Sequence, residues 1–287
     1  MRGIAALVAT GLLLQAAAAA DSEPEEEEGL PLWEMRGVAF GQVFPAYPGA
    51  GDQNVTILPL PYPLYRGKIL RFGEDFENFA EGRVFKRERM KLDLSFDATF
   101  PSKSKDIDVR EGMPDLDLLV EVGPELEIKL SENQERKAKL LLNLQLRGVF
   151  SMDGLDMKGR GWVFNPELEY KIDEYFSPRN ELSLRWAPAW ATRRYMDFFY
   201  SVQPEFATPV RPAFEASSGY LTSEFKLGLK RQLTERLRFI GSARLWVNKG
   251  AANENSPLYE KDYGWGVRAA LMWTFWKSKK RAGEEDD

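Results

Sequence analysis

The chain of 287 residues contains neither cysteine nor histidine. The absence of cysteine excludes disulfide bonds, thiol nucleophiles and a lipid anchor attached through a cysteine. The absence of histidine excludes Ser-His-Asp hydrolysis, catalysis by a histidine general base and metal sites built on imidazole ligands. We therefore expect no enzyme activity, no metal site and no cofactor.

The chain also has little that could cross a membrane as a helix, which requires about 20 consecutive apolar residues. Mean hydropathy is −0.41 and 29% of the residues are charged. An apolar stretch runs from Ile4 to Leu14, after Met1 and Arg2 and before a run of alanines that ends at Ala20. This arrangement is typical of a secretory signal peptide; an uncleaved membrane anchor is the alternative. We predict a signal peptide at residues 1–20, cleaved to leave Asp21 first.

What the chain does have is a strict alternation of apolar and polar residues over long segments. Side chains on a β-strand point alternately to two faces, so each such segment has one apolar and one polar face. The clearest case lies between Asp115 and Leu130, with apolar residues at Leu116, Leu118, Val120, Val122, Pro124, Leu126, Ile128 and Leu130. The pattern recurs at 90–100, where Phe100 closes the apolar set, and at 140–147, 162–172 and 263–275. Aromatic residues near the ends of these segments are expected for girdles at the two membrane interfaces.

These segments predict an all-β fold, an antiparallel transmembrane β-barrel. A soluble β-sandwich is the alternative, but its strands usually have about 5 to 6 residues, whereas a tilted membrane strand needs roughly 9 to 11. We count twelve strands, an even number that places both chain ends on the periplasmic side. Since two of the segments, 67–73 and 79–87, are weakly patterned, ten strands is the alternative count. The twelve segments lie near residues 33–44, 55–65, 67–73, 79–87, 89–100, 115–130, 137–149, 161–172, 180–190, 219–230, 235–248 and 262–276.

The segments are joined by connections that alternate between short and long. We expect the short ones in the periplasm and the longer ones, at 45–54, 101–114, 150–160, 191–218 and 249–261, to face outward. Outside the barrel, at 31–276, lie an acidic segment at 21–30, expected to be disordered, and a charged periplasmic tail at 277–287. Both ends are interpreted as solvated; contact with periplasmic partners is the alternative.

The polar faces of the predicted strands carry charged residues that we expect to line the lumen. These candidate lumen charges are Asp93, Asp97, Glu121, Glu125, Glu167, Glu169, Arg147, Arg185, Arg238, Arg244 and Arg268. A pair of carboxylates is the requirement for glycoside hydrolysis, but no spacing selects any two of these, so catalysis is not expected. One hypothesis is that the acidic and basic residues pair across or around the lumen and narrow it. The alternative is a hydrated channel in which they do not meet.

Several short motifs occur in order along the chain and resemble a known family. They are Leu58-Pro59-Leu60-Pro61-Tyr62 after a turn with Pro45, Tyr47, Pro48 and Gly49, then Gly112-Met113-Pro114-Asp115-Leu116-Asp117, Arg194-Tyr195-Met196, Phe199-Tyr200-Ser201-Val202 and Asn255-Ser256-Pro257-Leu258. Together they resemble the MltA-interacting protein (MipA/OmpV) family of outer-membrane proteins. The charged tail after Trp276 departs from the usual ending of that family. The prolines at Pro59 and Pro61 also have a purely structural interpretation, since they can shape an irregular strand where a ladder bond is missing.

The resemblance implies a non-enzymatic protein of the Gram-negative cell outer membrane, exported through its cleaved signal peptide. Members are viewed as scaffolds that bring a lytic transglycosylase together with a murein (peptidoglycan) synthase; others are linked to envelope stress, adhesion or small-molecule resistance. The implied partners are thus outer-membrane lipid and these two enzymes, with no nucleic acid. A channel or ligand-binding barrel is the alternative function. For that alternative, the loop at 191–218 is the segment of interest, because Tyr195, Phe198, Phe199 and Tyr200 are candidates to pack into or over the lumen.

Overall fold

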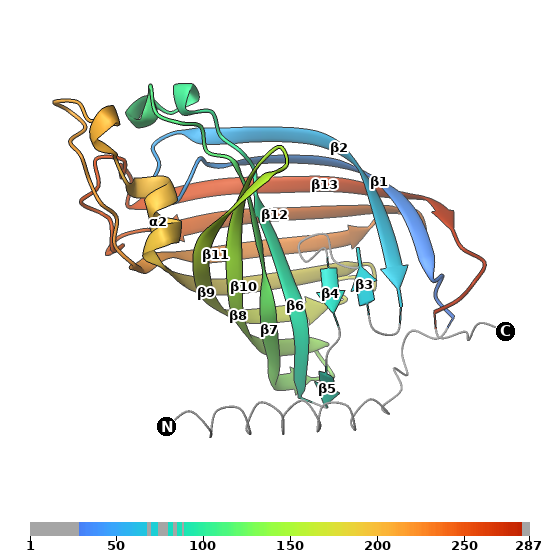
Figure 1. The fold of residues 1–287 in the computed structure, drawn as a ribbon. Coiled ribbons are helices and arrows are strands. Elements are labelled where there is room, and N and C mark those ends of the chain that lie inside the picture. The colour runs from blue at the N-terminus through green and yellow to red at the C-terminus, as the bar shows by residue number, and fades with distance from the viewer. Residues whose placement is uncertain (1–28, 68–69, 74–79, 83–84, 88, 283–287) are drawn as a thin grey trace, which may run out of the picture.

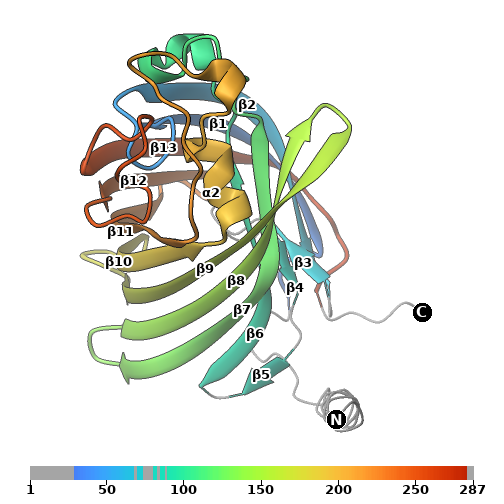
Figure 2. The ribbon, with the colours of Figure 1, turned by 60° about the vertical axis from the view of Figure 1, so that its left-hand side comes forward.

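The computed structural model describes residues 29–67, 70–73, 80–82, 85–87 and 89–282. They form one curled sheet of thirteen strands in the order β4-β3-β2-β1-β13-β12-β11-β10-β9-β8-β7-β6-β5 (Figures 1 and 2). Every ladder in the sheet is antiparallel, including the ladder that joins the first and last strands, β1 and β13. The predicted all-β antiparallel barrel is therefore confirmed.

Ten strands are long and three are short. The long ones are β1 (Trp33–Pro45), β2 (Gln53–Arg66), β6 (Met90–Thr99), β7 (Leu118–Asn133), β8 (Ala138–Asp153), β9 (Asp156–Asp173), β10 (Asn180–Ala191), β11 (Gly219–Gln232), β12 (Leu237–Val247) and β13 (Tyr263–Lys277). The short ones, of three residues each, are β3 (Leu70–Phe72), β4 (Ala80–Gly82) and β5 (Phe85–Arg87). The predicted segment 79–87 thus corresponds to two short strands, and the predicted segment 67–73 to one.

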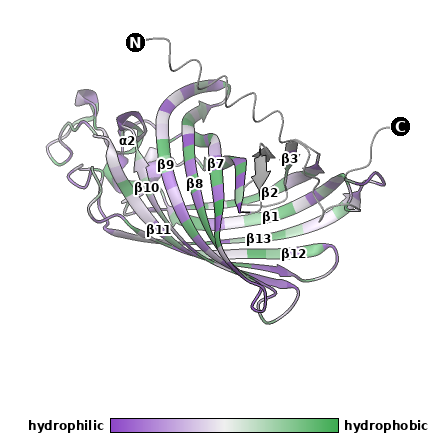
Figure 3. Cartoon of the chain, turned by 90° about the horizontal axis from the view of Figure 1, so that it is seen from below, coloured by the Kyte–Doolittle hydropathy of each residue, from purple (hydrophilic) through white to green (hydrophobic). Residues whose placement is uncertain are grey.

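The alternation along the strands separates an outer and an inner face, as the sequence predicts. On β13 the outward side chains are exposed, with 56% of Trp265 and 54% of Trp273 accessible, while Ala270 and Met272 between them are buried. On β7 the order is the same, since Glu121 is buried and its neighbours Val120 and Val122 lie on the other face. Bands of opposite hydropathy alternate along the strands in Figure 3. A wall with an apolar outer face can sit in lipid while its inner face holds polar groups.

Phe100 does not face outward as the predicted alternation at 90–100 requires. Strand β6 ends at Thr99, so the alternation no longer holds at the next residue. The Phe100 ring lies 5.6 Å from the ring of Phe40, which points inward from β1 and is buried. Phe100 therefore contacts an inward-facing residue instead of facing outward with the rest of its apolar set.

Both described ends of the chain lie together, at the end of the barrel opposite the outer loops (Figure 1). Pro31 forms a bridge with Arg281, and the Leu32 amide donates to the Lys280 carbonyl at 2.9 Å. The predicted tail therefore begins as a continuation of the pairing in the wall, with Lys277 still inside β13. The predicted signal peptide, residues 21–28 of the acidic segment and residues 283–287 lie outside the described residues.

The outer connections fold back onto the mouth of the barrel. The longest contains the helix α2 (Arg193–Tyr200) and a short 3₁₀ turn, η3 (Pro204–Phe206); the connection after β6 contains η1 (Ser104–Asp106) and η2 (Asp108–Arg110). In α2 the buried residues Tyr195, Met196, Phe199 and Tyr200 recur at helical spacing, which gives the helix one apolar face. Within the described part of the chain, no helix combines the length and apolar character that crossing a bilayer requires.

Candidate functional site

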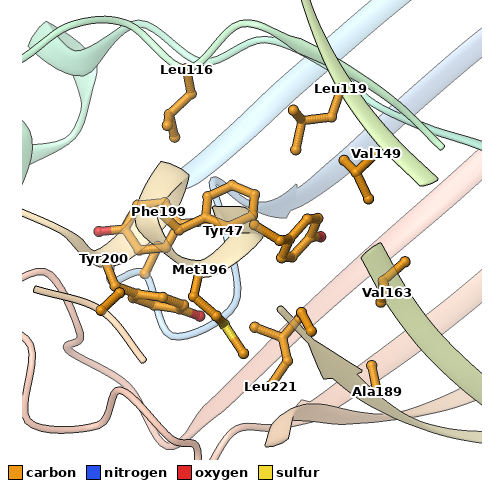
Figure 4. Close-up of a cluster of buried hydrophobic side chains, with 14 of the residues drawn as sticks. Tyr47, Leu116, Leu119, Val149, Val163, Ala189, Met196, Phe199, Tyr200 and Leu221 are labelled. Carbon is orange, nitrogen blue, oxygen red and sulfur yellow. The ribbon is translucent and has the colours of Figure 1, made fainter. Parts of the chain in front are cut away.

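A cluster of buried apolar residues, the hydrophobic plug, packs at the end of the barrel where α2 lies (Figure 4). The apolar face of α2 packs against inward-facing residues at the outer ends of five neighbouring strands (Figure 4). Those residues are Leu119 on β7, Val149 on β8, Val163 on β9, Ala189 on β10 and Leu221 on β11. Phe199 and Met196 are almost inaccessible to solvent, at 2% and 0%. Of the four aromatics singled out in the sequence, Tyr195, Phe199 and Tyr200 are buried here, and Phe198 is partly buried against the same cluster.

Hydrogen bonds join the plug to the other outer connections. The Tyr200 hydroxyl donates to the Pro48 carbonyl at 2.6 Å, and the Tyr47 hydroxyl donates to the Leu258 carbonyl at 2.7 Å. The buried Arg110 guanidinium donates to the Phe199 carbonyl at 3.0 Å. Burial raises the pKa of the Tyr47 and Tyr200 hydroxyls well above their ordinary value and lowers the pKa of Arg110. Two outer connections are thus bonded to α2, and a third is bonded to the first of these through Tyr47, so that the plug forms one packed unit.

Beneath the plug lies a cavity of about 240 Å³. Tyr47, Tyr195 and Phe199 of the plug and its supporting loops line it, together with inward residues of the barrel wall. Charged residues of β6 to β13 line the cavity, from Asp97 on β6 to Arg268 on β13, and aromatic residues of β1, β6 and β12 line it as well. The cavity wall therefore combines charged and aromatic side chains.

The charged residues on β7 to β10 form ion pairs between neighbouring strands. Arg147 on β8 contacts Glu121 on β7 at 3.0 Å, and both are buried. Arg185 on β10 contacts two carboxylates of β9, at 2.8 Å for Glu169 and 3.8 Å for Glu167. These ion pairs join adjacent strands around the wall. The hypothesis of paired lumen charges allowed pairing either around or across the lumen.

The remaining candidate lumen charges have varied surroundings. Arg244 on β12 contacts Glu224 on β11 at 3.1 Å. Two others bond to amides, since Arg268 donates to Gln42 at 2.8 Å and Arg238 donates to Gln232 at 2.9 Å. Asp93 contacts Lys91 of its own strand at 2.5 Å. Asp97 lines the cavity and Glu125 is buried on β7.

Several inward polar residues were missed by the sequence reasoning. Glu224 and Gln42 belong to predicted segments, and their inward positions follow from the same alternation that selected Arg244 and Arg268. A second missed group lies near the chain ends, where Glu34 accepts from Arg36 at 2.7 Å and from Arg66 at 2.9 Å, all three being buried. The sequence could have indicated the contact between Glu34 and Arg36, because residues two apart on β1 lie on the same face of the strand.

In this arrangement cationic side chains pair with carboxylates. The Arg147, Arg185 and Arg244 guanidinium groups each face a carboxylate, which neutralises both partners within the wall. Among the described residues, no three Asp or Glu side chains gather closely enough to hold a metal ion. The site is chemically a small amphipathic cavity.

Comparison with known proteins identifies a family relationship. A family model described as "MltA-interacting protein MipA" matches residues 37–275. None of the curated proteins compared with the chain matches it.

Solved structures that match the chain have low sequence identity to it. An outer membrane channel from Pseudomonas putida F1 is 10% identical with a TM-score of 0.46, and the match covers 89% of this chain and 100% of that one. A bacterial polysaccharide outer membrane secretin is 9% identical with a TM-score of 0.45, covering 86% and 99%. The translocator domain of the autotransporter NalP from Neisseria meningitidis is 10% identical with a TM-score of 0.40, covering 94% and 96%.

Proposed function

Because the chain belongs to the MltA-interacting protein MipA family, we propose that it is a non-enzymatic outer-membrane scaffold for murein-remodelling enzymes. In this role the barrel anchors the protein in the lipid, and its periplasmic end binds a lytic transglycosylase and a murein synthase. The observation that carries the proposal is the plugged outer mouth. A barrel whose outer end is filled by a packed hydrophobic cluster is poorly suited to free diffusion of solutes, whereas anchoring does not require an open lumen.

The periplasmic rim offers a surface for such a partner. Near the paired chain ends, Lys277, Lys279 and Arg281 are exposed. Arg231 at the end of β11 and Arg236 in the turn that follows are also exposed. This turn lies beside the end of β13, since the Thr274 amide donates to the Arg236 carbonyl at 2.8 Å. A cluster of cations on one rim favours a partner with an acidic surface, through a steering effect that weakens with salt.

Co-purification from cross-linked envelopes tests the proposal. Tagged protein should bring down a lytic transglycosylase and a murein synthase, identified by mass spectrometry, and the variant Arg236→Glu/Lys279→Glu should recover less of both. The matched control is Lys249→Glu/Lys261→Glu, which reverses two exposed lysines in the outer loop between β12 and β13. Recovery of no murein enzyme by the natural protein would remove the scaffold role.

The cavity beneath the plug supports a second candidate, a channel or ligand-binding barrel. The two candidates differ in conductance. A plugged scaffold gives no large, stable current steps in planar bilayers, whereas an open channel does. Such steps in the natural protein would favour the channel, and deletion of residues 193–217 should then change solute uptake.

A further inference from the structure

Strained backbone is concentrated in two neighbouring turns at the periplasmic rim. Within the described ranges, the non-glycine residues with a positive φ are Lys137 at 48°, Glu174 at 60° and Phe176 at 56°. Lys137 lies in the turn between β7 and β8, and the other two lie in the turn between β9 and β10. A residue as bulky as phenylalanine rarely adopts this conformation. Such residues persist where the surrounding structure fixes them, and they are concentrated at functional sites.

Hydrogen bonds within the turn between β9 and β10 hold Phe176 in place. The Tyr175 amide donates to the Asn180 carbonyl at 3.0 Å, and the Asn180 side-chain amide donates back to the Tyr175 carbonyl at 3.0 Å. Inside this loop, the Asn180 amide donates to the Ser177 carbonyl at 3.0 Å. The backbone on both sides of Phe176 is therefore fixed by the turn itself.

The same turn is bonded to the turns on either side of it. Towards β8, the Asp173 amide donates to the Lys137 carbonyl at 2.8 Å, and the side chains of Lys137 and Glu174 form an ion pair. Towards β12, the Gln232 amide donates to the Arg179 carbonyl at 2.8 Å. Three periplasmic turns thus form one continuous surface, whose shape is set before any partner binds.

Phe176 exposes an apolar ring on this surface. Its side chain is 90% exposed, and its ring lies beside that of Tyr175, with the two centroids 4.3 Å apart. A single exposed apolar side chain is common on protein surfaces. Here, however, a strained and well-bonded backbone presents the ring, so its exposure is imposed by the fold. An aromatic ring on a rigid turn loses little freedom on binding, which suits an anchor at the centre of an interface.

Exposed cations lie beside this ring. Arg179 belongs to the same turn, and Arg231 and Arg236 flank the next turn, which is bonded to the first. Leu233, in that second turn, is 39% exposed and adds apolar area. A surface of this kind fits an apolar pocket edged by carboxylates, because opposite charges steer the encounter while the buried ring supplies the contact.

We propose that Phe176 is the anchor of the protein-binding surface on the periplasmic rim, and that it inserts into an apolar pocket of a murein-remodelling enzyme. The inference rests on the proposed scaffold role and adds to it the residue and the chemistry of the contact. Arg179 and Arg231 face carboxylates at the edge of the pocket. A membrane interface favours Trp and Tyr, whose rings carry a polar atom; Phe176 has none, which favours a dry pocket in a protein over lipid headgroups.

Photocrosslinking in intact cells tests this contact. The photoreactive analogue p-benzoylphenylalanine is incorporated in place of Phe176 in the tagged protein. The matched control carries it in place of Leu155, which is fully exposed in the outer turn between β8 and β9. Crosslinks from position 176 to a lytic transglycosylase or a murein synthase are expected, with none from position 155. Crosslinks from position 176 to phospholipid alone, or to no murein enzyme, would overturn the anchor.

Glycine substitutions separate this inference from the scaffold role. Phe176→Gly removes the ring and suits the left-handed backbone, so the barrel should stay folded, which heat-modifiable migration in gels verifies. Recovery of the enzyme in co-purification should fall about tenfold or more, as expected for an interface anchor, while Leu155→Gly should not change it. Equal recovery with Phe176→Gly and with the natural protein would refute the anchor and leave the scaffold role intact. Recovery of no murein enzyme by the natural protein would remove both.

Discussion

The plug allows a quantitative prediction for Phe199→Ala. Phe199 is 2% exposed and packs between Tyr47, Tyr195 and the strand residues beneath α2. Replacing a buried phenylalanine with alanine costs about 3–5 kcal/mol. Because the barrel wall is held by its own ladders, we expect this loss to fall on docking of α2 and not on the barrel. At 1.4 kcal/mol for each tenfold change, undocking becomes roughly two to four orders of magnitude more frequent.

Amide hydrogen exchange measures this change directly. Exchange of residues 193–200 should accelerate by the same factor, since local opening sets the exchange rate of a segment that undocks as a unit. Exchange of β8 and β9 should stay as in the natural protein. The matched control is Phe198→Ala, on the same helix but only partly buried, for which a smaller acceleration is expected. Equal exchange of α2 in the natural protein and in Phe199→Ala would refute the packed plug.

Three further predictions concern the wall and the plug. Arg147→Ala leaves the buried Glu121 carboxylate without its guanidinium partner, so the free energy of unfolding in urea should fall by about 3–5 kcal/mol. Gly123→Ala places a Cβ against the Leu146 carbonyl oxygen and should abolish the heat-modifiable folded form in gels, whereas Gly159→Ala, with nothing within 4 Å, should not. Burial raises the pKa of Tyr200 above its ordinary 10.0, so the protonated hydroxyl favours the docked plug, and docking should weaken as the pH rises above 10. Exchange of α2 at increasing pH, corrected for intrinsic exchange, measures that loss.

The wall was predictable because its signal is local. A strand with polar residues at every second position indicates its two faces without reference to the rest of the fold. Burial alternates in this way over Leu118–Glu125 of β7 and over most of β13. The inward contact of Phe100 and the short length of β3 to β5, which lie within the predicted segments 67–73 and 79–87, were not predictable in the same way. Both depend on where the sheet ends, which is a property of the whole barrel.

The candidate site was likewise predictable only where its signal is local. Alternation places Glu121 and Arg147 on the inner face, but their contact depends on the register of β7 against β8, in which Val122 pairs with Gly148. Likewise, the aromatic residues of α2 are visible in the sequence. Their contacts with Leu119 and Val149 are not, because these come from other strands and meet α2 only where the barrel closes at its mouth.

The ladder between β1 and β13 makes assembly of the barrel wait for the carboxy-terminal strand. Until Tyr263–Lys277 has emerged and docked, Trp33–Pro45 has only one neighbour, and an open sheet edge is exposed to other chains. Closure of the wall at β1 therefore depends on docking of β13. A chain cut short before this last strand retains an open edge that periplasmic chaperones and proteases can recognise.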